Sequence, residues 1–370
     1  MHQALSRRAR VPARGLALAL ALAVGWPLGA VSSTDEPELE VEVIGEGIER
    51  VLADSVGHRF DRRPLRDVAI APDGTVWLVQ GRRILQLDQP GSTGPRSDRW
   101  QHFVRRIELT PDGELWAVED GGTVVRLTEG VLEDRSDGRR STGGSLAAFP
   151  DGELGRTVRG EEGLVPVVST NDGASWQELP SAGLEWLLGP GLARHVLART
   201  DDGRTWIGVD RGPLGGGLAV FDGTAWTPVE VVAGTRDLRV AAVVPGDEGS
   251  VWALAQVGQP GGQGRHVLIR LHEGGISVLG EEQGMPQDTS LAWISWSPLE
   301  PIALAVDARG RVWFSVGDIG VWVYDGDGFE RVRTPALRAG ALDIEAAADG
   351  HVWVVSRAGQ LLRLDEAAHP

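Results

Sequence analysis

The chain has 370 residues, 42% of them hydrophobic and 24% charged, and its formal net charge is −16. It contains no Cys and no Lys, so all 36 basic residues are Arg. This composition excludes disulfides, thiolate nucleophiles, Cys-ligated zinc and Schiff-base chemistry on Lys. An acidic protein repels phosphate backbones and anionic headgroups, so we expect no nucleic-acid partner.

Residues 1–30 are predicted to be an export signal. The basic stretch Ser6–Arg10 precedes the apolar run Leu16–Val24, and small residues suited to cleavage follow at Gly29–Ser32. We therefore expect a periplasmic or extracellular protein with no stable membrane insertion after cleavage. The alternative is an uncleaved anchor, because residues 15–31 form an apolar stretch at the lower limit for spanning a bilayer.

Residues 31–60 are expected to be an N-terminal segment with one strand, Leu39–Ile44, in which Val41 and Val43 alternate with acids. Residues 61–366 are then predicted to fold as one repeat domain, followed by a tail at 367–370.

Seven repeats make up this domain. Each unit has a short alternating apolar run, an acidic-Gly turn and a polar-apolar-Trp step into a second run, and the third unit has Gly in place of the Trp. A period of about 40 to 50 residues holding four short strands is typical of a β-propeller. The anchor residues are Trp77, Trp116, Gly155, Trp206, Trp252, Trp313 and Trp353. We expect each Trp to be a core wedge between blades.

The fourth unit illustrates the predicted blade. Its strands are expected at His195–Thr200, Arg204–Val209, Gly216–Phe221 and Ala225–Glu230. Asp-Gly pairs after the first and third strands predict two-residue hairpin turns, because both residues tolerate positive φ.

The last unit supplies three strands, at Leu342–Ala347, His351–Ser356 and Gln360–Leu364. The N-terminal strand Leu39–Ile44 is predicted to pair there as the fourth, which would close the ring and remove an exposed edge. The expected fold is therefore all-β: a seven-bladed β-propeller of four-stranded blades, closed by its N-terminal strand.

Two segments carry a family resemblance. Gly215–Thr227 and Gly320–Phe329 are similar to the two-component regulator propeller repeat, and the resemblance extends over about residues 65 to 365. It implies an exported, stand-alone propeller without a kinase, because the chain ends 17 residues beyond Trp353. Any sensing output would then pass through another polypeptide.

A second resemblance is local. Ser169–Trp176 resembles the Asp-box hairpin of sialidase-like propellers, with Asn171 where the first Asp usually stands. In that family the box is a structural turn, so it implies no glycosidase. Sialidase chemistry would also require a nucleophilic Tyr, and the single Tyr of this chain, Tyr324, lies inside a repeat strand.

The binding surface is expected on one face of the ring. Loops between the second and third strands, together with the connections between blades, share this loop face, where propellers usually bind ligands. Its charged residues are candidates for holding a polar ligand, the alternative being a solvated rim. The selected candidates are Asp210, Arg211, Asp318 and Arg357, within a wider set of Arg82, Glu119, Asp120, Glu161 and Glu162.

The connector Gly280–Pro301 is unusually long and carries Asp288, Trp293 and Trp296. Long loops with aromatic residues are often binding elements, so these three residues complete the predicted ligand site. Alternatively, the two Trp cap the barrel or form part of a strand.

Histidine raises the enzyme alternative, because streptogramin lyases are propellers that use a catalytic His and Mg²⁺. His266 and His272 lie on one predicted strand roughly 20 Å apart, too far to share a metal. A lyase interpretation would be favoured if His266 or His102 stood at the channel mouth beside two acids. Asp325–Gly328 predicts a hairpin turn, since no calcium-loop Glu follows.

The sequence thus predicts a non-enzymatic, exported β-propeller that binds a protein or a saccharide through its loop face, as a sensor or scaffold. No catalytic residue, metal or cofactor is predicted. The alternative function is a streptogramin-lyase-like or polysaccharide-lyase-like enzyme with its site at the channel mouth.

Overall fold

A computed structural model describes residues 40–43 and most of 65–365, apart from 82, 88–95, 100–102, 129–130, 143–144, 161–162, 171–172, 174, 188–192, 232–237, 259–263, 274, 288–301 and 318. All described residues belong to the unit Glu38–Pro370. Among them there is no α-helix, only short 3₁₀ turns. No helix in this described part is both long and apolar enough to cross a membrane.

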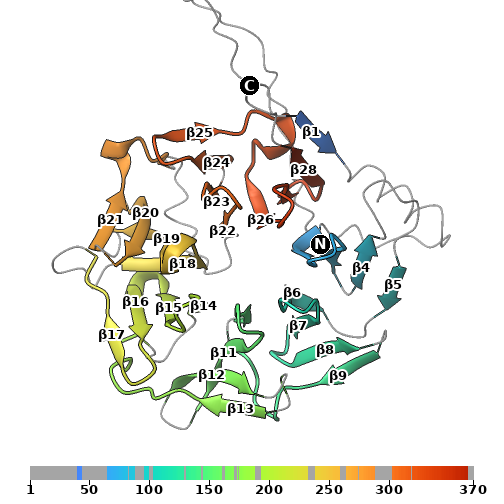
Figure 1. The fold of residues 1–370 in the computed structure, drawn as a ribbon, viewed down its shortest axis with the longest axis vertical. Helices are drawn as coiled ribbons and strands as arrows, with labels where there is room; N and C mark the ends of the chain where they lie inside the picture. Colours follow the sequence, from blue (N-terminus) through green and yellow to red (C-terminus); the bar gives the residue numbers. More distant parts are fainter. Residues whose placement is uncertain are drawn as a thin grey trace, which may run out of the picture. The chain divides into compact units, whose positions relative to one another are not determined.

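The described chain forms seven four-stranded antiparallel sheets arranged as blades around a ring (Figure 1). The inner strand of each blade contacts the inner strand of the next, and that of the last blade contacts that of the first. The predicted seven-bladed β-propeller is therefore confirmed.

The blades are built in chain order. Blade 1 holds β2 (Leu65–Ile70), β3 (Val76–Gln80), β4 (Arg83–Leu87) and β5 (Arg96–Arg99). Blade 2 holds β6 (Val104–Leu109), β7 (Leu115–Glu119), β8 (Val124–Thr128) and β9 (Val131–Asp134), and blade 3 holds β10 (Ala147–Ala148), β11 (Leu154–Arg159), β12 (Leu164–Thr170) and β13 (Ser175–Glu178). Blade 4 holds β14 (Arg194–Arg199), β15 (Thr205–Asp210), β16 (Gly216–Phe221) and β17 (Trp226–Pro228).

The second half of the ring follows the same plan. Blade 5 holds β18 (Leu238–Pro245), β19 (Val251–Val257), β20 (Arg265–His272) and β21 (Gly275–Leu279). Blade 6 holds β22 (Ile302–Val306), β23 (Val312–Val316), β24 (Val321–Tyr324) and β25 (Phe329–Arg331). Blade 7 holds β26 (Ala341–Ala346), β27 (Val352–Ser356) and β28 (Leu361–Asp365), and β1 (Glu40–Val43) is its outer strand. β1 pairs antiparallel with β28, with Glu40 opposite Asp365 and Val43 opposite Leu362.

The first turn of blade 4 corrects a detail of the prediction. The Thr200 amide donates to the Arg204 carbonyl at 3.0 Å, so three residues rather than two form the loop. Gly203, the third of them, has φ +84°, which is the left-handed position of a three-residue hairpin with a bulge. The turn after β16 has the predicted length of two residues, but these are Gly223 and Thr224 rather than Asp222 and Gly223, because the Asp222 amide donates to the Ala225 carbonyl.

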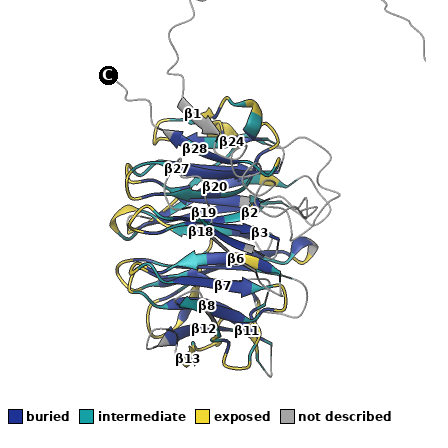
Figure 2. Ribbon diagram, turned by 90° about the vertical axis from the view of Figure 1, so that its right-hand side faces the viewer, coloured by how far each residue is buried: buried dark blue, intermediate teal, exposed yellow. Residues whose placement is uncertain are grey.

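The repeated Trp is a core residue. Five of its copies, Trp116, Trp206, Trp252, Trp313 and Trp353, are at most 5% exposed, whereas Trp77 is half-buried. Figure 2 shows buried residues along the strands and exposed residues gathered at the turns. Each blade therefore buries both faces against its neighbours, and the predicted wedge role is confirmed for these five residues.

Blade 3 replaces its missing Trp in another way. A Cβ on Gly155 would lie 2.3 Å from the Phe149 ring, so that ring occupies the space beside the glycine. Arg199 of blade 4 stacks over the same ring, with Cζ 4.2 Å from its centroid. Phe149 thus fills the interface that a Trp fills elsewhere in the ring.

Candidate functional site

The predicted site residues fall into two groups. Asp288, Trp293, Trp296 and Asp318 lie outside the described residues, as do Arg82, Glu161, Glu162 and His102. Asp210 ends β15 of blade 4, Arg211 follows it, and Arg357 lies in the loop between β27 and β28 of blade 7. Because the strands alternate in direction, all three are on the loop face. Asp210 and Arg211 belong to blade 4 and Arg357 to blade 7, with blades 5 and 6 between them in the chain order of the ring.

An apolar surface lies beside Arg211. Among the described residues three large hydrophobic side chains are exposed, and two of them belong to this surface: Trp186, 41% exposed, and Leu214, 64% exposed. The Arg211 Nη1 donates to the Trp186 carbonyl at 3.3 Å, and the Leu214 amide donates to the Arg211 carbonyl at 3.3 Å. We call Trp186, Arg211 and Leu214 the blade-4 surface.

Glycine positions the Trp of this surface. A Cβ on Gly217 would lie 2.5 Å from the Trp186 ring, so the ring lies directly against the start of β16. The Trp186 Nε1 donates to the Gly183 carbonyl at 3.0 Å, which fixes the polar end of the side chain. The glycine run that marks the family resemblance therefore supports an exposed aromatic ring.

Asp210 has a structural role. Its Oδ1 accepts the Gly212 amide at 2.8 Å, which holds the turn that presents Arg211 and Leu214. The Arg239 guanidinium, from the next blade, has its pKa lowered by burial, and the Asp210 carboxylate opposes this shift. Asp210 thus organises the loop and offsets a buried charge on blade 5.

His195 lies beneath this loop and is 2% exposed. Burial, followed by the positive charge of Arg211, lowers the pKa of its imidazole to about 4. Neither ring nitrogen has a hydrogen-bond partner among the described residues. The imidazole is therefore neutral at physiological pH and packs as a core side chain.

A charged cluster on the inner strands was missed by the sequence analysis. The Asp343 Oδ2 of blade 7 accepts the Val68 amide of blade 1 at 2.9 Å. The Asp67 Oδ2 of blade 1 accepts the Ile107 amide of blade 2 at 2.5 Å. Carboxylates therefore satisfy amides on the free edge of each following inner strand, which would otherwise lack partners.

The same pattern reaches blade 3, where the Glu108 carboxylate accepts the Ala148 amide. Glu108 also pairs with Arg106 at 2.5 Å between Oε1 and Nε. Glu345, two residues after Asp343 on the same face of β26, completes the cluster. Four carboxylates and one guanidinium thus meet where blades 7, 1 and 2 adjoin. The cluster is Asp67, Arg106, Glu108, Asp343 and Glu345.

Enclosure by the blades dominates the electrostatics of this cluster. It raises the pKa of Asp67 well above its usual range, and the carboxylate of Asp343, which is hydrogen-bonded to that of Asp67, raises it further. The pKa of Glu345 is raised by burial, then by Asp343 and Glu108. Solvent still reaches the cluster, because the Arg106 side chain is 45% exposed.

In blades 1, 2 and 7, a β-bulge comes directly before the first residue of the cluster. The extra residue is Arg66 in blade 1, Arg105 in blade 2 and Leu342 in blade 7. A bulge reverses the alternation of side chains from that point on. The three bulges therefore aim Asp67, Arg106 and Asp343 at the junctions between inner strands.

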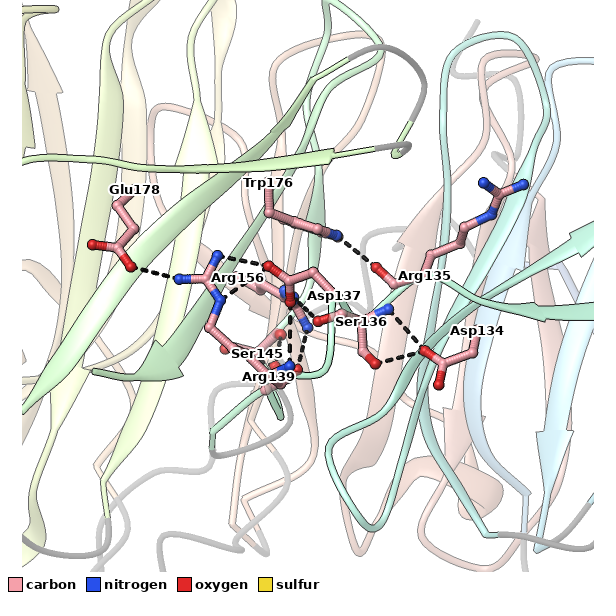
Figure 3. A network of polar contacts seen from close by, with 10 residues as sticks. Asp134, Arg135, Ser136, Asp137, Arg139, Ser145, Arg156, Trp176 and Glu178 are labelled. Carbon is pink, nitrogen blue, oxygen red and sulfur yellow. Dashed lines mark hydrogen bonds and ion pairs between the residues drawn. The ribbon is translucent and has the colours of Figure 1, made fainter. Parts of the chain in front are cut away.

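A second polar network joins blades 2 and 3 (Figure 3). Arg156 of β11 is fully buried, and its Nη2 donates to the Ser136 carbonyl at 2.7 Å and to the Asp137 Oδ1 at 2.6 Å. Its Nη1 donates to the Arg139 carbonyl at 3.0 Å. Burial lowers the pKa of this guanidinium to about 10, and Asp137 opposes the shift.

The Trp of the Asp-box-like hairpin belongs to the same network. The Trp176 ring lies 4.1 Å from the Arg156 Cζ, and its Nε1 donates to the Arg135 carbonyl at 2.6 Å. The network therefore holds the loop after blade 2, residues 135–139, against blade 3, and its role is structural.

The histidine condition for a lyase is not met by His266. It lies on β20, the third strand from the inner edge of blade 5, and its backbone bonds the Gln287 side chain at 2.8 and 2.9 Å. Within the described ranges, no group of three or more His, Asp and Glu side chains is arranged to hold a metal ion.

Two hollows mark the surface near blades 6 and 7. The first, about 370 Å³, lies between Asp307 and His351, at the turns that join the first and second strands of blades 6 and 7. There Asp307 accepts hydrogen bonds from Arg311 Nε at 2.7 Å and from Trp313 Nε1 at 2.8 Å, so its carboxylate is used structurally. The second, about 520 Å³, is lined by Arg331, Val332, Arg333, Thr334, Pro335 and Arg338.

No protein-family model and no curated protein matches the sequence. Solved structures share its fold. A catalytically inactive virginiamycin B lyase from Staphylococcus aureus, determined with quinupristin, is 14% identical with a TM-score of 0.60, and the match covers 89% of this chain and 100% of that chain. YCF48 bound to a peptide is 15% identical with a TM-score of 0.56, covering 90% and 98%.

The extracellular domain of a hybrid two-component system from B. thetaiotaomicron is also similar, at 14% identity and a TM-score of 0.54. The match covers 81% of this chain and 38% of that chain. At such identities these likenesses establish a shared propeller fold and leave function to the residues of the site itself.

Proposed function

We propose that this protein is an exported, non-enzymatic binding module that holds a polypeptide partner on its loop face, against the blade-4 surface. The observation that carries the proposal is the exposure of Trp186 and Leu214 on either side of Arg211. Exposed aromatic and Arg side chains on a rigid support are the residues that dominate protein interfaces.

The geometry of this surface favours a polypeptide over a saccharide. Leu214 is 64% exposed. Burying an aliphatic side chain against apolar groups of a polypeptide is more favourable in free energy than covering it with the hydroxyl groups of a saccharide. Arg211 keeps donors at the same surface, which suits a backbone carbonyl or a carboxylate. The peptide complex of YCF48, a protein of similar fold, is consistent with a polypeptide ligand on such a ring.

The predicted insert residues Asp288, Trp293 and Trp296 would add to the same function, because their connector between β21 and β22 joins two blades at the loop face. A lyase-like activity, the alternative, is supported by the fold of the virginiamycin B lyase. No cluster of His and acids among the described residues favours it.

Capture from native envelope and culture supernatant tests the proposal. We expect the full chain to retain one partner, and Leu214→Ser to lower its recovery at least about fivefold, the effect of losing about 1 kcal/mol. Ile276→Ser is the matched control, because Ile276 is 42% exposed on the outer strand of blade 5. Equal recovery by both variants would contradict the proposal. A parallel Trp293→Ala/Trp296→Ala variant tests the insert separately.

A further inference from the structure

The second hollow on the surface is built from a short segment that the proposed function does not use. This segment runs from the end of β25 through the 3₁₀ turn Pro335–Leu337 to blade 7. Two buried side chains fix it, Val332 at 3% exposure and Leu337 at 1%. The Val332 amide also donates to the Val321 carbonyl at 2.9 Å. Its exposed residues are therefore presented on a fixed backbone.

Arginine dominates the lining of this hollow. Three of its six residues, Arg331, Arg333 and Arg338, carry a permanent positive charge, and none is acidic. This is unusual in a chain with 52 acidic and 36 basic residues. Among the described residues, no carboxylate lies within ion-pair distance of Arg331 or Arg338. We call this feature the arginine hollow.

A glycine in the neighbouring loop leaves room for one of these side chains. A Cβ on Gly320 would lie 3.1 Å from the Arg331 Nε and 3.2 Å from its Nη2. Gly320 also has φ +94°, which side-chain-bearing residues rarely adopt. The Arg331 guanidinium therefore lies close to Gly320, in the loop between β23 and β24, at the wall of the hollow.

The volume of the hollow fits a small organic anion. Its volume of about 520 Å³ falls within the range of about 300–1,000 Å³ that is usual for small organic ligands. Guanidinium groups bind carboxylates through paired, parallel hydrogen bonds, and Val332 and Pro335 add an apolar wall.

We propose that the arginine hollow binds a small organic polycarboxylate. This site lies between blades 6 and 7, so it is separate from the blade-4 surface and does not depend on the proposed partner. Arg331 and Arg338 supply the charge-assisted hydrogen bonds, and the fixed segment between them sets their spacing.

Titration calorimetry of the full chain at low ionic strength tests this site, with citrate, sulfate and glucose as the probes. We expect citrate to bind saturably at one site, at least about tenfold more tightly than sulfate, and glucose to give no binding. Arg331→Gln/Arg338→Gln should weaken citrate binding at least about tenfold, the loss of about 1.4 kcal/mol.

The matched control is Arg105→Gln/Arg265→Gln, which removes the same charge from exposed arginines elsewhere on the ring. It should change citrate affinity less than about twofold, and all variants should keep the wild-type melting temperature. Absence of citrate binding, equal binding of sulfate, or equal loss in both double variants would overturn the proposal. Capture of the protein partner by Leu214→Ser is a separate measurement, so failure of the citrate site would leave the proposed function standing, and the reverse also holds.

Discussion

The Asp67 carboxyl group is hydrogen-bonded to the Asp343 carboxyl group, across the junction of the first and last blades. Each also accepts a backbone amide from the following inner strand. Burial, followed by repulsion from the Asp343 carboxylate, raises the pKa of Asp67 well above its usual range. We therefore expect the stability of this junction to depend on pH.

Asp67→Asn should make the protein more stable at neutral and mildly alkaline pH. The pKa of Asp67 is higher in the folded chain than its usual unfolded value of about 4. Its favourable contribution is therefore complete below about pH 4 and is lost as the pH rises through the folded pKa. An Asn keeps both hydrogen bonds without titrating, so we expect a larger free energy of unfolding than wild type at pH 8 and little difference at pH 4.

Urea unfolding of wild type and Asp67→Asn from pH 4 to pH 9 measures this effect. The charged groups facing Asp67 are Asp343 and Arg106, with Glu108 and Glu345 beyond them. The two free energies of unfolding should converge at the acid end and separate as the pH rises. Parallel curves would show that Asp67 does not titrate in this range.

Arg156→Met should destabilise the protein far more than Arg139→Met. Arg156 is fully buried, and its loss removes the guanidinium donor of the Arg139 carbonyl and one of the donors of the Ser136 carbonyl and of the Asp137 carboxylate. Arg139 shares Asp137 but is 29% exposed. We expect about 3–5 kcal/mol for the first variant and about 1 kcal/mol or less for the second. Chemical denaturation at pH 7 compares them, and similar losses would contradict the assigned role of Arg156.

Gly155→Ala should be destabilising through one neighbour, Phe149. The added Cβ would lie 2.3 Å from that ring, and overpacking of this kind costs about 1–3 kcal/mol. Phe149→Leu leaves a smaller side chain and should cost about 1–2 kcal/mol alone. The double variant should be more stable than the sum of the two losses predicts. Additive losses in thermal unfolding would mean that the ring does not fill the place of the missing Trp.

The repeat pattern predicted most of the fold, because its signals are local. The turn before each Trp and the alternation along each strand are local signals, so the fourth-blade strands His195–Thr200 and Gly216–Phe221 were predicted to within one residue of β14 and β16. The length of the first turn was wrong, because Asp201 precedes the Asp-Gly pair and also belongs to the loop.

The site was less accessible to sequence analysis. Arg211 was selected as a loop residue, but Trp186 was not, because its exposure depends on how Gly217 packs beneath it. The inner-strand cluster was missed although a signal exists: Asp343 and Glu345 flank Ile344 in a strand that should face the core. Carboxylates are favourable in this strand because the next blade places unpaired backbone amides beside them, and the sequence alone does not show that arrangement.

Photo-crosslinking from the blade-4 surface tests the binding-module account most directly. A photoreactive amino acid at position 214 should form one discrete crosslink to a partner polypeptide in native envelope or culture supernatant, and unlabelled wild-type protein should compete it away. The same probe at position 276, where Ile276 is 42% exposed on the outer strand of blade 5, should form none. Crosslinks of equal yield at both positions, or none at position 214, would contradict the account.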